Sequence, residues 1–143
     1  MELKKYQQTA IETLKEYLKE LQKVGIKYAF MGITNKPYNP DFFSEIPFVC
    51  VKIPTGGGKT LVACHATQEI MKNALANKMD RGIVMWFVPS EAIKTQTLKK
   101  FKDKNDPHRR ALDEAFQTGV RIFSNGHLNP PRKHTASESA SLT

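Results

Sequence analysis

The sequence predicts an α/β domain, in which a parallel sheet is flanked by helices and preceded by an N-terminal helix. Two apolar runs support this fold class. Residues 48–53 (Phe-Val-Cys-Val-Lys-Ile) form a short β-branched run, and residues 82–88 (Gly-Ile-Val-Met-Trp-Phe-Val) are apolar without alternation, which is typical of a strand covered on both faces. Helical patterns lie between and after these runs. This order predicts a doubly wound sheet whose ligands bind at the carboxyl ends of the strands.

The first element is an amphipathic helix that ends near Gly25. Residues 28–47 contain three prolines and predict an irregular connection, long enough to be a functional loop. The helix itself is predicted from apolar residues that recur at steps of three and four: Leu3, Tyr6, Ala10, Leu14, Tyr17, Leu18 and Leu21.

Three further helices and a third strand complete the predicted order. A helix runs from Lys59 to about residue 77, and Pro89 stops the strand that follows it. Ser90 can cap the next helix, because a serine oxygen accepts from the free N–H groups of a first turn. Residues 109–117 predict another helix, and residues 120–123 the short third strand.

Composition restricts the class of protein. The chain has 143 residues, 40% hydrophobic and 25% charged, which is the composition of one soluble globular domain. Its longest apolar run, 83–88, is far below the roughly 18 residues of a membrane span, and no signal core follows the lysine-rich start, so a cytoplasmic location is expected. Cys50 and Cys64 lack a metal-type spacing and are predicted to be buried, reduced thiols; Trp86 is predicted to lie in the core.

Positive charge is concentrated in one window. The net charge is +8, and residues 92–110 hold seven basic and two acidic residues, so 7 − 2 = +5 of it lies there. This excess favours a polyanionic partner such as nucleic acid. A solvated helix face is the alternative interpretation.

Residues 54–60 (Pro-Thr-Gly-Gly-Gly-Lys-Thr) follow a predicted strand and open a predicted helix, which is the context of a phosphate-binding loop. Glycines allow backbone N–H groups to approach phosphate oxygens, and the helix adds the positive end of its dipole. In such a loop Lys59 reaches the β- and γ-phosphates and the Thr60 hydroxyl holds Mg²⁺. A glycine-rich hairpin or a plain helix entry is the structural alternative.

Three stretches resemble the superfamily 2 helicases and translocases. The loop has Ile53 where the general phosphate loop has glycine, and in this form it resembles motif I of that superfamily. Residues 3–11 look like the family's "L-R-x-Y-Q-x-x-A" element, whose glutamine, here Gln7, reads adenine. Residues 89–96 are similar to motif Ia, which contacts the nucleic-acid backbone; the residues implied are Ser90, Lys94 and Gln96.

Within the superfamily, residues 3–125 most resemble the N-terminal part of the ATPase subunit of type III restriction enzymes. The resemblance implies a partial RecA-like P-loop NTPase domain at 1–128, followed by a tail at 129–143 that its composition predicts to be disordered. It implies ATP and Mg²⁺ as cofactors, a nucleic acid, expected to be DNA, as partner, and a methyltransferase or specificity subunit as a further partner. The nucleotide-binding residues implied are Gln7, Thr55, Gly56, Gly57, Gly58, Lys59 and Thr60.

The hydrolytic residues are not found in the sequence. Asp113 and Glu114 resemble a D-E-x-x box, but they follow a helical pattern rather than an apolar strand, so the catalytic interpretation is rejected. We therefore expect a truncated or interrupted motor that binds ATP without hydrolysing it alone. The competing hypotheses are another P-loop phosphotransferase and a non-enzymatic basic nucleic-acid-binding module.

Overall fold

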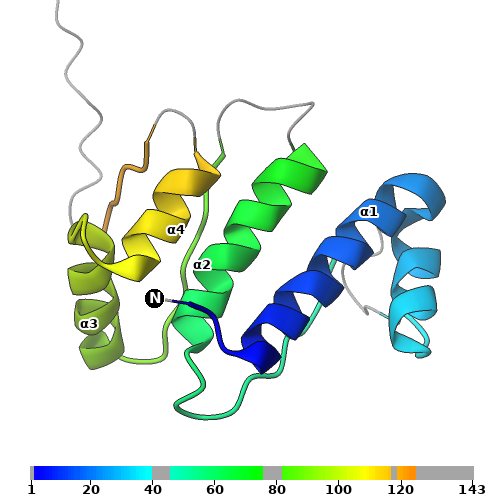
Figure 1. The fold of residues 1–143 in the computed structure, drawn as a ribbon, viewed down its shortest axis with the longest axis horizontal. Coiled ribbons are helices and arrows are strands. Elements are labelled where there is room, and N and C mark those ends of the chain that lie inside the picture. The colour runs from blue at the N-terminus through cyan, green and yellow to red at the C-terminus, as the bar shows by residue number, and fades with distance from the viewer. Residues whose placement is uncertain (1, 40–45, 76–81, 117–118, 125–143) are drawn as a thin grey trace, which may run out of the picture.

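The structure, a computed structural model, describes residues 2–39, 46–75, 82–116 and 119–124. These parts of the chain form a layer of helices in which α2 lies between α1 and α4, with α3 at one side (Figure 1). No helix among them is both long and apolar enough to cross a membrane. The helices are α1 (Lys5–Thr34), α2 (Lys59–Ile70), the π-helical turn η1 (Met71–Leu75), α3 (Glu91–Lys102) and α4 (Pro107–Ala115).

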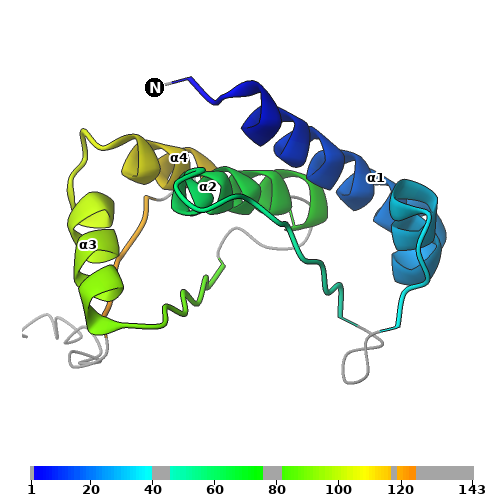
Figure 2. The ribbon, with the colours of Figure 1, turned by 90° about the horizontal axis from the view of Figure 1, so that it is seen from below.

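The predicted parallel sheet is wrong for the part of the chain that the structure describes. Among the described residues, 48–53, 82–88 and 120–123 have neither strand nor helix assignments. The three segments lie on one side of the helix layer (Figure 2). β-branched composition favours an extended chain, but a strand also needs a neighbour that pairs with its N–H and C=O groups. That pairing is what the described residues lack.

One side of the 82–88 segment packs against the helices and the other is bare. Ile83, Met85 and Phe87 are 93%, 74% and 86% exposed, whereas Trp86 is half-buried and meets the ring of Phe101 edge-on at a centroid distance of 5.0 Å. The prediction that this segment is covered on both faces is therefore wrong. Trp86, which was predicted to lie in the core, is partly buried and packs against the core cluster that contains Cys64 and Phe101. The burial of the segment alternates, as an extended chain lying on a single layer requires.

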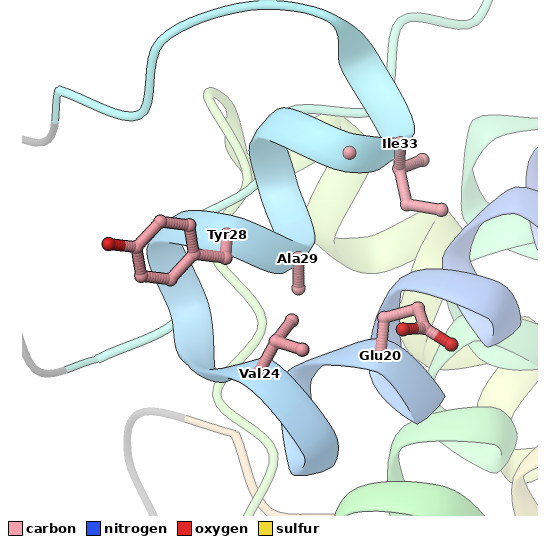
Figure 3. A pocket seen from close by; sticks show the side chains of 6 residues that line it. Glu20, Val24, Tyr28, Ala29 and Ile33 are labelled. Atoms are coloured by element: carbon pink, nitrogen blue, oxygen red, sulfur yellow. The ribbon is translucent and has the colours of Figure 1, made fainter.

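Helix α1 kinks at the glycine where it was predicted to end. Gly25 has φ 81° and ψ 172°, which is not helical, but the helix resumes and runs to Thr34. The predicted irregular connection is therefore wrong over residues 28–34. Figure 3 shows Glu20 and Val24 facing Ala29 across the kink, where the two arms of the helix enclose an open cavity of about 250 Å³. Asn35, with φ 54°, ends the second arm in a left-handed cap.

The other helices agree with the sequence to within a few residues. α2 begins at Lys59 as predicted and continues through η1 to Leu75; the rest of that prediction lies outside the described residues. α3 begins after Ser90, whose Oγ accepts from the Ile93 N–H at 3.4 Å, so the predicted cap is confirmed. α4 covers Pro107–Ala115 rather than 109–117. The predicted tail at 129–143 lies outside the described residues.

Two apolar clusters fix the helices, and α2 contributes to both. On one side Ala66 packs against Leu14, Tyr17 and Leu18 of α1. Burial raises the pKa of Tyr17, and nearby Tyr38 raises it further. On the other side Cys64 lies fully buried in a second cluster that joins α2, α3 and α4: Cys64, Phe101, Ala111 and Leu112. Helix α2 therefore holds the loop that precedes it in a fixed place relative to α1.

The two cysteines differ, contrary to the prediction that both are buried. Cys50 is exposed and Cys64 is fully buried. Burial, helped by the Asp106 carboxylate and opposed by Lys100, raises the pKa of the Cys64 thiol to about 12. Because the thiolate is the reactive form, Cys64 is inert at neutral pH.

We expect a disulfide reagent to react rapidly with Cys50 alone in the folded chain, and with both thiols after denaturation. Spectroscopic titration of released thiolate measures the two rates. Cys50→Ser should remove the fast reaction and Cys64→Ser should keep it. Two fast reactions in the folded chain would contradict the burial of Cys64.

Candidate functional site

The glycine loop is a tight turn that leads directly into α2. The Gly57 N–H donates to the Pro54 carbonyl at 2.9 Å, which closes a four-residue turn. Gly56 has φ 73°, as the third residue of a type II turn requires, and Gly58 has φ 76° as the N-cap of α2. Both conformations favour glycine, because a Cβ is strained at positive φ. The predicted strand-to-helix context therefore holds at its helical end.

Two side chains at the start of α1 form hydrogen bonds with this loop. The Gln7 Nε2 donates to the Gly57 carbonyl at 2.8 Å, and the Tyr6 hydroxyl donates to the same oxygen at 3.0 Å. These contacts join residues 50 and 51 positions apart in the sequence. Gln7 is 4% exposed, and its Oε1 accepts from the Lys4 N–H at 2.8 Å. The fold thus brings together the two stretches that sequence reasoning assigned to one nucleotide site.

Two of the three glycines leave no room for a side chain. A Cβ on Gly57 would lie 2.8 Å from both the Ile53 Cγ2 and the Pro54 carbonyl oxygen, and a Cβ on Gly58 would lie 2.6 Å from the Gln7 Nε2. Ile53, the residue that departs from the general phosphate loop, is buried directly against the turn. The backbone of Gly57 therefore packs against Ile53, and the backbone of Gly58 packs against Gln7 of α1.

The open side of the loop presents donors and a cation. The N–H groups of the first turn of α2, from Lys59 onward, have no intrahelical acceptor, and no side chain in the described ranges caps this helix. The exposed Lys59 ammonium donates to the Pro54 carbonyl at 3.1 Å, so it already folds over the loop. Thr60 is partly buried and Thr55 and Gly56 are exposed. This donor set fits a polyphosphate.

The Gln7 side-chain amide is already hydrogen-bonded within the protein, whereas a role in reading adenine needs a free donor and acceptor. Both ends of the amide have protein partners. An amide still has a second N–H and a second acceptor lone pair, so it can hold the loop and contact a base together. Sequence reasoning did not assign the Tyr6 contact. Its only signal was an aromatic residue placed directly before Gln7.

The predicted nucleic-acid residues lie at the start of α3. Ser90 caps this helix, and the Lys94 ammonium pairs with the Glu91 carboxylate at 3.1 Å within it. Gln96 is exposed. Helices α2 and α3 both begin at the lower edge of the view in Figure 1, whereas Figure 2 shows the start of α3 set off to one side of the layer that contains α2.

The basic window is not one uniform surface. Lys99, Lys102, Lys104 and Arg110 are exposed. Arg109 instead turns inward: its NH1 donates to the Phe101 carbonyl at 2.9 Å, its NH2 to the Val120 carbonyl at 3.0 Å, and its Nε to the Asp113 carboxylate at 2.8 Å. It fastens the end of α3 to α4 and to the 120–124 segment. One of the seven predicted cations is therefore structural.

Asp113 and Glu114 both lie in α4, as their rejection as a catalytic box requires. The Asp113 carboxylate accepts a hydrogen bond from the Arg109 Nε, and the Glu114 Oε2 accepts one from the Gln68 Nε2 at 2.8 Å. Within the described residues, no group of three or more His, Cys, Asp and Glu side chains could hold a metal ion by itself. A Mg²⁺ at the loop would depend on Thr60 and on the oxygens of a ligand.

A comparison with known families decides the affiliation. The family model for the res subunit of type III restriction enzymes matches residues 1–138, nearly the whole chain. The chain belongs to this family. No curated protein and no solved structure matches it. Membership in the Res family confirms the resemblance inferred from the sequence, and it supports a helicase-like, ATP-binding part of a restriction-modification enzyme.

Proposed function

We propose that this chain is the ATP-binding N-terminal portion of a Res-family DNA helicase or translocase and binds ATP with Mg²⁺ at residues 54–60. The contact of Gln7 and Tyr6 with the Gly57 carbonyl carries the proposal, because it joins the adenine-reading element to the phosphate loop. Proteins of the Res family generally use ATP and Mg²⁺, act on DNA and pair with a modification subunit.

Each part of the loop has a role in this proposal. Thr55 and the three glycines form the cradle, the N–H groups of Gly58 and of the first turn of α2 bind phosphate oxygens, and Lys59 moves from the Pro54 carbonyl to the β- and γ-phosphates. The Thr60 hydroxyl holds Mg²⁺, which neutralises phosphate charge. Gln7 contacts the adenine edge with the amide hydrogen that Gly57 does not use.

A DNA backbone is proposed along the start of α3. Ser90 and the first N–H groups of α3 bind one phosphate, while Lys94, Gln96 and the exposed cations that follow contact others. Lys94 is available for this role, since an ion pair with the exposed Glu91 contributes little free energy in water. The adjacent acids Asp113 and Glu114 lie in α4 and are engaged by Arg109 and Gln68, and we propose binding rather than hydrolysis for the chain itself.

Lys59→Ala tests the nucleotide site. We expect the affinity for MgATP, measured by isothermal titration calorimetry, to fall more than about tenfold, because the cation that faces the phosphates is removed. The melting temperature should hardly change, since Lys59 is exposed and contacts only the loop. Lys52→Ala, which removes an exposed lysine from the preceding segment, is the matched control and should bind like the wild type.

The same variant separates the alternatives. Equal MgATP binding by Lys59→Ala and the wild type would disprove the phosphate-loop assignment and leave the basic nucleic-acid-binding module. Tight binding of GTP as well as ATP would contradict the role of Gln7 and favour a different P-loop enzyme.

A further inference from the structure

The Gly57 carbonyl is held by two side chains at once. The Tyr6 hydroxyl lies 3.0 Å and the Gln7 Nε2 2.8 Å from this oxygen. A carbonyl oxygen has two lone pairs, so the two donors saturate it. Both come from neighbouring positions in the first turn of α1, which fixes the direction from which the carbonyl is held.

Holding this carbonyl also orients the next N–H group. The C=O of one residue and the N–H of the next point in opposite directions across a trans peptide, and no described peptide bond is cis. Because the Gly57 oxygen points toward α1, the Gly58 N–H points away from it. Gly58 is the N-cap of α2, so this N–H lies among the donors of the proposed phosphate cradle.

Tyr6 and Gln7 contribute in different ways. Gln7 is buried and also accepts from the Lys4 N–H, so replacing it disturbs the start of α1 as well as the loop. Tyr6 is 41% exposed, and its hydroxyl would lie only 3.3 Å from a Cβ built on Gly57. The hydroxyl can therefore be removed, as Tyr6→Phe, without opening a cavity or uncapping the helix.

We infer that Tyr6 is a positioning residue of the nucleotide site, whose hydroxyl fixes the Gly57–Gly58 peptide so that the Gly58 N–H faces the phosphates of the ligand. This inference rests on the proposed function. Tyr6 touches neither base nor phosphate; it acts through the backbone of the loop. Its contribution is therefore specific to ligands that carry phosphates.

The test compares MgATP with adenosine as probes, using the full chain and the variant Tyr6→Phe. We expect MgATP affinity to fall about fivefold, the effect of one hydrogen bond, while adenosine affinity and the melting temperature stay the same. Tyr28→Phe is the matched control, because Tyr28 is 67% exposed on the second arm of α1, beside the kink cavity (Figure 3). It should bind both probes like the wild type.

A second measurement does not need a nucleotide. The amide resonance of Gly58 in the ligand-free chain should shift in Tyr6→Phe and stay in place in Tyr28→Phe. An unmoved Gly58 resonance, or equal losses for adenosine and MgATP, would overturn the role of Tyr6. If the wild-type chain binds neither MgATP nor adenosine, the proposed function is wrong. The role of Tyr6, which rests on that function, is then wrong too.

Discussion

Gly57→Ala is expected to abolish measurable MgATP binding and to destabilise the chain. A Cβ at this position would lie 2.8 Å from the Pro54 carbonyl oxygen and 2.8 Å from the Cγ2 of buried Ile53. The Pro54 carbonyl cannot move without opening the turn, because it accepts the Gly57 N–H that closes the turn. Forced overpacking costs about 1 to 3 kcal/mol, and displacement of the Gly57 carbonyl breaks the contacts of Tyr6 and Gln7.

Gly32→Ala is the control for this substitution. Gly32 lies in the second arm of α1, and a Cβ there would meet nothing within 4 Å. Alanine favours a helix over glycine by about 0.5 to 1 kcal/mol, so this variant should melt slightly higher and bind MgATP unchanged. Thermal unfolding and calorimetry measure both variants. If Gly57→Ala binds MgATP as tightly as Gly32→Ala does, the loop is not a packed phosphate cradle.

The candidate site was predictable where its signals are local. The glycine run before Lys59 predicts a turn and a helix start, and the structure has both. Ser90 predicts a cap by the same kind of argument, since a serine oxygen needs only an N–H three residues away. The contact between Tyr6 and Gly57 spans 51 positions, and nothing in the sequence around Tyr6 specifies its partner.

The sheet was not predictable because strand pairing is not local. Apolar, β-branched runs at 48–53 and 82–88 favour an extended backbone, and the described chain is irregular there, without the paired ladder that defines a strand. Gly25 shows a related ambiguity. A glycine can end a helix or kink it, and only the packing of Ala29 against Leu14, Tyr17 and Leu18 shows that the helix resumes.

The number of basic residues in the 92–110 window does not show which of them face the protein interior. Arg109 and Arg110 are adjacent and count equally in the basic window. Yet the Arg109 guanidinium has three protein partners, whereas Arg110 is exposed. The fork of donors on arginine suits several carbonyls at once, so an arginine near a helix junction can be structural despite its charge.

Arg109→Ala is therefore expected to destabilise the chain by about 3 kcal/mol, with no comparable effect from Arg110→Ala. Removing the guanidinium leaves the Phe101 and Val120 carbonyls without their donor and Asp113 without its ion pair. Its side chain is only 13% exposed, so solvent replaces these contacts poorly. Arg109→Lys should recover little, because one ammonium cannot reach all three acceptors. Urea denaturation measures the free energy of unfolding of each variant.

For binding to duplex DNA we expect the opposite ranking of the two substitutions: Arg110→Ala should have the larger effect and Arg109→Ala the smaller. If the exposed cations after Ser90 contact phosphates, Arg110→Ala should weaken binding and reduce the salt slope by about 0.9, the value for one lost phosphate contact. Under conditions where it stays folded, Arg109→Ala should keep the wild-type slope, since its guanidinium faces the protein. Equal slopes for Arg110→Ala and the wild type would remove Arg110 from the DNA surface. A lower slope for folded Arg109→Ala would show that the inward contacts open when DNA binds.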